Sequence, residues 1–170
     1  MNLLNFAVMH NARLFTLICS IISIFSVAIP IYANNPTDFC FASTGEKFGI
    51  DPLLLEAISY VESRNDPLAI GYNQESIDYG HMQINSYWIK YLGVEYIKLN
   101  NPCFCTKVGA AILANCIDVH GFNKNALSCY NSGKKLDSLK PEIKTKVLVY
   151  IGSVKKRYNH LVNPPGEGID

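Results

Sequence analysis

Apolar residues recur at helical spacing through most of the chain and predict a mainly α-helical domain. The clearest helix begins at Asp51-Pro52, because aspartate accepts hydrogen bonds at a helix N-cap and proline fits the first helical position. Its apolar face is formed by four residues at helical spacing: Leu54, Ala57, Ile58 and Val61. This helix ends near Asn65-Asp66-Pro67.

Four further helices follow from the same pattern. We expect them over residues 39–48 before Gly49, from Pro102 to about His120 before Gly121, in a shorter segment ending at Gly133, and from Pro141 to Leu161. The expected apolar face of the second is Val108, Ala111, Ile112 and Val119. That of the last is Ile143, Val147, Ile151, Val154, Tyr158 and Leu161. Small residues allow the helix after Pro102 to pack closely at the centre: Gly109, Ala110, Ala111 and Ala114.

The helical pattern is interrupted between Asp66 and Gly80. This stretch is rich in turn-forming residues, and a polar excursion of this length is more often functional than a mere connection. We expect an irregular or β-structured segment here, followed by a short aromatic helix around Trp88.

The first 33 residues have the composition of a secretory signal. An uncharged apolar run from Leu14 to Ile29 follows Arg13, and Ala33 offers a cleavage site. The alternative is an uncleaved membrane anchor, because Ile31 is larger than the small residue usual at that position. We therefore expect a signal peptide at 1–33, a single domain at 34–162 and a flexible tail at 163–170.

Charge is balanced after residue 33 but unevenly distributed. Residues 34–133 carry six Lys and Arg against ten Asp and Glu, whereas residues 134–170 carry eight against four. The basic C-terminal helix either meets an acidic polymer or is simply a solvated face. The near-zero net charge after residue 33 and the absence of a nucleic-acid-binding motif argue against a nucleic-acid partner.

Cysteine usage fits an oxidising compartment. Five cysteines follow the signal, and their spacings match no usual zinc pattern, so disulfides are expected and no metal site. Cys105 and Cys116 lie on one predicted helix, roughly 16 Å apart, and cannot bond to each other. Cys116 and Cys129 flank a short connection between two helices, which favours their pairing.

Glu62 is the candidate catalytic group. It projects from the edge of the apolar face of its helix, and a carboxyl group half-buried against aliphatic side chains has a raised pKa. A raised pKa keeps a general acid protonated at neutral pH. The alternative is a structural carboxylate in the last helical turn, bonded to Arg64 or to backbone.

Three separated motifs resemble the lysozyme-like superfamily. They are Asp51-Pro52-Leu53-Leu54 with Glu62-Ser63-Arg64, then Gly80-His81-Met82-Gln83-Ile84-Asn85, and Ala126 with Tyr130-Asn131 and Gly133. Together they are most similar to the small specialised lytic transglycosylases of type III and type IV secretion, pilus and conjugation systems in Gram-negative bacteria. The resemblance covers roughly residues 40–161.

The resemblance implies a lysozyme-like fold and a peptidoglycan substrate. Glu62 would protonate the glycosidic oxygen between N-acetylmuramic acid and N-acetylglucosamine, and then act as base while the 6-hydroxyl closes a 1,6-anhydro ring. Ser63 would orient the substrate or Glu62, Gln83 would line the cleft, and Tyr130 would hold Glu62 by its hydroxyl. Asn131 would support the turn. Family members also pair a cysteine near the start of the domain with one in Asn101-Pro102-Cys103, which implies Cys40–Cys103.

Two positions depart from this pattern. His81 replaces an apolar residue, and either faces the cleft as a titratable group or is packed or solvent-facing. Asp78 aligns with the second catalytic carboxylate of animal-type lysozymes, which a retaining hydrolase places about 5 Å from the acid. Asp78 therefore assists catalysis, or merely shapes a turn.

Three functions remain open at this stage. The first is an exported, periplasmic lytic transglycosylase that opens the cell wall for assembly of a secretion, pilus or conjugation machine. The second is a hydrolytic lysozyme using Glu62 and Asp78. The third is a non-catalytic glycan-binding scaffold, against which a desolvated acid argues. The chemistry calls for no metal or other cofactor.

Overall fold

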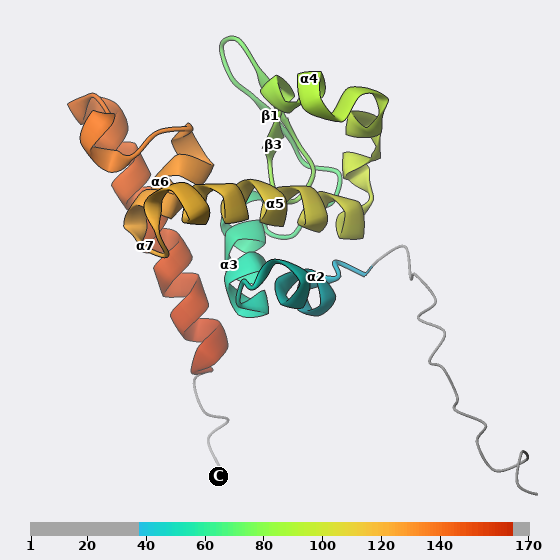
Figure 1. Ribbon diagram of the computed structural model, residues 1–170, viewed down its shortest axis with the longest axis horizontal. Coiled ribbons are helices and arrows are strands. Elements are labelled where there is room, and N and C mark those ends of the chain that lie inside the picture. Colours follow the sequence, from blue (N-terminus) through green and yellow to red (C-terminus); the bar gives the residue numbers. More distant parts are fainter. Residues whose placement is uncertain (1–37, 165–170) are drawn as a thin grey trace, which may run out of the picture. The chain divides into compact units, whose positions relative to one another are not determined.

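The computed structural model describes residues 38–164, so the predicted signal peptide and most of the predicted tail lie outside the described residues. The described chain is mainly helical with one small sheet, as the sequence predicts (Figure 1). The elements, in chain order, are α2 (Phe41–Phe48), α3 (Pro52–Ser63), β1 (Ile70–Tyr72), β2 (Ile77–Tyr79), β3 (Ile84–Asn85), η1 (Ser86–Trp88), α4 (Ile89–Leu92), η2 (Gly93–Asn100), α5 (Pro102–His120), α6 (Lys124–Ser132), η3 (Leu136–Ser138) and α7 (Pro141–Val162).

The boundary signals act at the predicted positions. The Asp51 carboxylate accepts a hydrogen bond from the Leu53 backbone N–H (2.9 Å) at the start of α3. Asn101 caps α5 in the same way, accepting from Phe104. At the C-terminal end of α6, Gly133 adopts a left-handed conformation (φ 70°), which a residue with a Cβ adopts only with strain.

The excursion after α3 forms a three-stranded antiparallel sheet in the order β1-β2-β3. Its register places Gly71 opposite Asp78 and Asp78 opposite Asn85. The sheet therefore places Asp78 in the central strand between two defined neighbours rather than within a turn.

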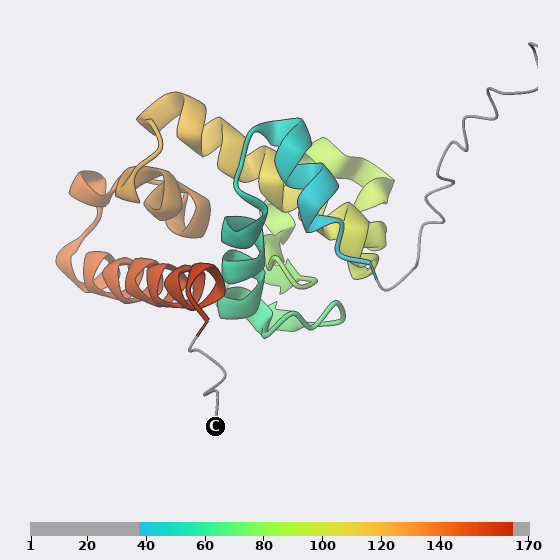
Figure 2. The same cartoon turned by 90° about the horizontal axis from the view of Figure 1, so that it is seen from below.

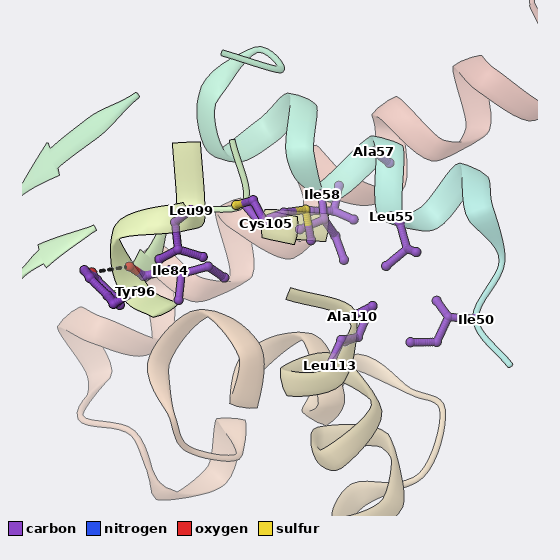
Figure 3. Packing of buried hydrophobic residues seen from close by; sticks show 12 residues of the cluster. Ile50, Leu55, Ala57, Ile58, Ile84, Tyr96, Leu99, Cys105, Ala110 and Leu113 are labelled. Carbon is purple, nitrogen blue, oxygen red and sulfur yellow. Dashed lines mark hydrogen bonds between the residues drawn. The ribbon is translucent and has the colours of Figure 1, made fainter. Parts of the chain in front are cut away.

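Helix α5 runs through the middle of the described domain and contributes much of the core (Figures 1 and 3). It is long and apolar enough to span a membrane by length and composition, but in this structure it packs against protein on several sides. It approaches its neighbours closely at Gly109, where an added Cβ would lie 2.6 Å from the Cε of the fully buried Met82. The absence of a side chain at Gly109 thus lets the loop before β3 rest directly on α5.

Part of the predicted helix packing is wrong. On α5, Ala111 and Val119 are exposed, and the buried face consists of Cys105, Thr106, Gly109, Ala110, Leu113 and Cys116. On α7, Ile143 is exposed, whereas Val147 and Val154 are buried. Helix α3 crosses α7 toward the C-terminal end of α7, as Figure 2 shows, whereas Ile143 lies in the first turn of α7.

Two disulfides fasten this framework. Cys40–Cys103 joins the chain before α2 to the first turn of α5, and Cys116–Cys129 joins α5 to α6. Both expected pairings are confirmed. Cys105 remains a buried free thiol among the described residues.

Candidate active site

A cleft of about 850 Å³ separates the sheet and α4 from the α5–α6 pair. The last turn of α3 brings Glu62 to it, and the other lining residues are Asn73, Asp78, Gln83, Ile84, Asn85, Tyr87, Trp88, Tyr91, Ile112, Asn115, Cys116, Cys129, Tyr130, Asn131, Ser132, Gly133 and Lys134. The predicted site residues Glu62, Asp78, Gln83, Tyr130 and Asn131 therefore meet in one cavity.

Burial is the main influence on Glu62. The pKa of its carboxyl is raised from 4.5 to about 7, mainly by burial and to a smaller extent by the negative charge of nearby Asp78. The hydroxyl of Tyr150, on α7, acts in the opposite direction and lowers the pKa. A carboxyl group with this pKa is available in both its acid and its base form near neutral pH.

The tyrosine hydroxyl that lowers the pKa of Glu62 is not the one that the sequence predicts, although Tyr130 also lies near Glu62. The Tyr130 hydroxyl donates to the backbone oxygen of Met82 (2.9 Å) and so holds α6 against the loop before β3. The hydroxyl that acts on Glu62 belongs to Tyr150, and this buried oxygen makes no hydrogen bond of ordinary length within residues 38–164. Burial, followed by the proximity of Glu62, raises the pKa of Tyr150 well above 10, so its hydroxyl stays protonated.

Asp78 is held in a polar environment by two amides. Asn73 donates to one carboxylate oxygen and Asn85 to the other, both at 2.7 Å. Two amide donors, one on each oxygen, fix the orientation of the carboxylate. The cleft thus contains two carboxyl groups in contrasting surroundings, one buried beside Tyr150 and one hydrogen-bonded.

Gln83 lies in the cleft lining with a left-handed backbone (φ 48°). Its side-chain N–H donates to the Gly80 oxygen (2.9 Å), which directs its amide toward β1. An added Cβ at Gly71 would lie 2.5 Å from the Gln83 amide oxygen and 3.6 Å from a carboxylate oxygen of Asp78. Gly71 therefore leaves room for these two polar groups.

Ser63 is not among the residues that line the cleft. Its hydroxyl donates to the backbone oxygen of His81 (3.0 Å) and accepts from the Asp66 N–H (3.1 Å). These bonds tie the end of α3 to the loop before β3. Ser63 thus holds the segment that carries Glu62.

His81 is fully buried, so the packed alternative is confirmed and the cleft-facing one is wrong. Its Nε2 lies 2.9 Å from the Pro102 backbone oxygen, which can only accept, so Nε2 carries the proton of the neutral ring. The Ser59 hydroxyl lies 2.7 Å from Nδ1. Burial lowers the pKa of His81 from 6.5 to about 4, and the Pro102 oxygen offsets part of this effect.

Sequence reasoning missed several residues of the site. Asn85 reaches Asp78 through the register of β2 with β3, and Asn73 reaches it from the turn between β1 and β2. Strands of two or three residues carry too little pattern to predict either contact. Tyr150 had a usable signal, because it follows Val147 by three residues and precedes Val154 by four on the predicted helix.

One wall of the cleft is aromatic. Tyr87 and Tyr91 are exposed, and their rings lie near that of Trp88. The ammonium group of Lys90 stands 3.6 Å from the centre of the Tyr87 ring. Aromatic rings of this kind offer flat apolar surfaces to the faces of sugar rings.

A second cavity, of about 280 Å³, lies between α3, α5, α6 and α7 and is lined mainly by aliphatic side chains. Its Asp51 carboxylate already accepts from Leu53 and from the Tyr158 hydroxyl (2.6 Å), so no free acid faces it. Within residues 38–164 no cluster of His, Cys, Asp and Glu side chains has the arrangement of a metal site. The cleft with Glu62 is the candidate active site.

Residues 39–144 match the family model of the transglycosylase SLT domain. The chain belongs to this family. The mainly helical structure with its small sheet is accordingly that of an SLT domain, which is lysozyme-like, and the resemblance drawn from the three motifs is confirmed.

Curated relatives of this SLT domain come from enteric bacteria. The chain is 40% identical to invasion protein IagB of Salmonella typhi over 99 residues, which are 55% of this chain and 62% of IagB. It is 34% identical to a peptidoglycan-binding-like protein of Escherichia coli O157:H7 over 155 residues, 84% of this chain and 92% of that protein. It is 31% identical to protein IpgF of Shigella flexneri over 124 residues, 70% of this chain and 78% of IpgF.

Proposed function

We propose that this protein is a peptidoglycan lytic transglycosylase with Glu62 as its acid and base. The observation that carries the proposal is the pKa of about 7 at Glu62, inside a cleft of about 850 Å³ that also presents Asp78 and an aromatic wall. A glycan-binding scaffold has no need of such a desolvated acid. Membership of the transglycosylase SLT family supports the same chemistry.

The protonated Glu62 carboxyl donates its proton to the oxygen of the β-1,4 bond that follows N-acetylmuramic acid. The bond from that oxygen to C1 breaks, N-acetylglucosamine leaves as an alcohol, and positive charge develops on the muramyl ring. The Glu62 carboxylate then removes the proton of the 6-hydroxyl of the same sugar. The 6-oxygen bonds to C1, which yields the 1,6-anhydro product and restores the acid without water.

Asp78 stabilises the positive charge that develops on the muramyl ring. Its carboxylate is fixed by Asn73 and Asn85, so little reorganisation is needed when charge appears. It also lies close enough to raise the pKa of Glu62. These same two observations favour one second candidate, a hydrolytic muramidase in which Asp78 traps or stabilises the glycosyl cation and water attacks it.

We further propose that the enzyme is exported to the periplasm and makes local gaps in the wall for a secretion, pilus or conjugation apparatus. The apolar N-terminal run supports export. The name of the relative IagB, an invasion protein, supports a link to such an apparatus.

The deciding experiment is a mass-spectrometric digest of purified peptidoglycan by residues 34–170 and by the variants Glu62→Gln and Asp78→Asn. We expect anhydromuropeptides from the parent protein, a loss of at least about a thousandfold in rate for Glu62→Gln, and a smaller loss for Asp78→Asn, because only Glu62 transfers protons.

Reducing-end products that disappear with either substitution would establish the hydrolase instead. A Glu62→Gln protein as active as the parent would refute the catalytic assignment. If the folded parent protein releases no product, alone or with added envelope fraction, the non-catalytic glycan-binding scaffold would be the remaining function.

A further inference from the structure

Lys134 lines the cleft from a backbone position that hydrogen bonds hold. It follows Gly133, the left-handed residue that ends α6, and its own backbone oxygen accepts from the hydroxyls of Ser128 (2.7 Å) and Ser132 (3.2 Å). Two hydroxyls on the last turns of α6 therefore anchor the backbone from which this side chain extends. The same helix carries Tyr130 and Asn131 of the cleft.

The charge of Lys134 is not neutralised by the protein. Its ammonium group takes part in no ion pair within residues 38–164, whereas Lys98 and Lys144 each have a carboxylate partner. Among the residues that line the cleft it is the one Lys or Arg, beside the two acidic residues Glu62 and Asp78. An anionic ligand that enters the cleft is repelled near Asp78 and attracted at Lys134.

We propose that Lys134 is a carboxylate-binding position for the muramyl residue of the glycan strand. The inference rests on the proposed peptidoglycan substrate, because uncharged sugar hydroxyls have no particular need of an ammonium group. The lactyl group of N-acetylmuramic acid either bears a peptide stem with free carboxylates or, when stripped of its stem, ends in a carboxylate itself. A flexible lysine can meet either, since its ammonium acts as a point charge without a required geometry.

The test measures binding, so that it does not depend on catalysis. A Glu62→Gln protein is titrated calorimetrically with three soluble strands of equal length: stem-bearing glycan, amidase-stripped glycan, and chitooligosaccharide, which has no carboxylate. Lys134→Gln, added to this background, is expected to raise the Kd for a carboxylate-bearing strand about fivefold at low salt. The Kd for chitooligosaccharide should not change. At 1 M salt, where charges are screened within about 3 Å, the difference should nearly vanish.

Two matched variants act as controls. Lys135→Gln removes the same charge from the next residue, which is exposed and does not line the cleft, and should leave every Kd unchanged. Lys134→Arg keeps the charge and should bind like the parent. If Lys134→Gln weakens binding of stem-bearing strands alone, Lys134 binds the stem carboxylates. If it weakens binding of stripped strands alone, Lys134 binds the lactyl carboxylate.

The remaining outcomes overturn the proposal. One is an equal loss of affinity for all three ligands on Lys134→Gln substitution. The others are no loss of affinity for either carboxylate-bearing strand, and a parent protein that binds no strand at all. If the strands bind as expected but wild-type protein releases no product, the proposed enzymatic function fails while the carboxylate site stands.

Discussion

The ionisation of Glu62 depends on a few neighbouring groups. Burial and Asp78 favour its protonated form, whereas the Tyr150 hydroxyl favours the carboxylate. In the proposed mechanism Tyr150 is therefore a positioning residue, because its hydroxyl keeps the pKa of Glu62 near neutral. Its buried hydroxyl makes no hydrogen bond of ordinary length within residues 38–164, so its removal should not destabilise the fold.

Replacing Tyr150 by phenylalanine should raise the pKa of Glu62 above about 7, because the group that lowers it is removed. The alkaline limb of the pH profile of kcat/KM should move to higher pH. The free energy of unfolding should change by less than about 1 kcal/mol. Tyr72→Phe, at an exposed tyrosine of β1, is the control. An unmoved alkaline limb would exclude this role.

Close packing of α5 decides how its neighbours are held. The sequence pattern favours a face that includes Ala111 and Val119, but both are exposed, whereas Gly109 is buried against Met82. The Met82 backbone in turn receives the Tyr130 hydroxyl. Helix α5 thus supports both the loop before β3 and the cleft face of α6.

Gly109→Ala should destabilise the protein by about 1–3 kcal/mol, because the new methyl group overpacks against Met82 even though alanine favours helix. Gly152→Ala is the matched control. It makes the same change in α7, where nothing lies within 4 Å of the added Cβ, and should stabilise by up to about 1 kcal/mol. Urea unfolding of both variants provides the measurement. Equal effects at the two glycines would show that packing at Gly109 is looser than described.

Across the whole molecule, two buried groups give opposite pH dependences of stability. Glu62 binds its proton more tightly in the folded state, so its contribution falls as pH rises from 4.5 to about 7. His81 binds its proton more weakly when folded, so its contribution rises between about pH 4 and 6.5. Each slope is about 1.4 kcal/mol per pH unit, and the two nearly cancel between pH 4.5 and 6.5.

Glu62→Gln should reveal the His81 slope. Relative to wild type, the variant should gain stability progressively above pH 4.5, reaching about 3 kcal/mol near pH 8, with no difference at pH 4. Chemical denaturation across this range measures the change. A constant difference between the two proteins at all pH values would contradict the raised pKa of Glu62.

Much of the fold and part of the site follow from local signals. Asp51-Pro52, Asn101-Pro102 and Gly133 mark helix boundaries because capping and left-handed geometry act over a few residues. Glu62 is recognisable because its place at the edge of an apolar helix face already implies a raised pKa. The hydrogen-bond partners of Asp78 cannot be recognised in this way, because strands as short as β2 and β3 contain too few alternating residues to fix a register.

Local sequence patterns are enough to predict most of the helices, Glu62 as the candidate acid and the Cys116–Cys129 pairing, and the three motifs add the family and Cys40–Cys103. Three features depend on the folded chain. They are the tyrosine whose hydroxyl lowers the pKa of Glu62, the positions of His81 and Ser63, and the face of α5 that is buried. The difference lies in the distance along the chain over which each interaction acts. Caps and periodicity act within a few turns, whereas desolvation, hydrogen bonds between distant segments and close packing at Gly109 depend on groups that only the folded chain brings together.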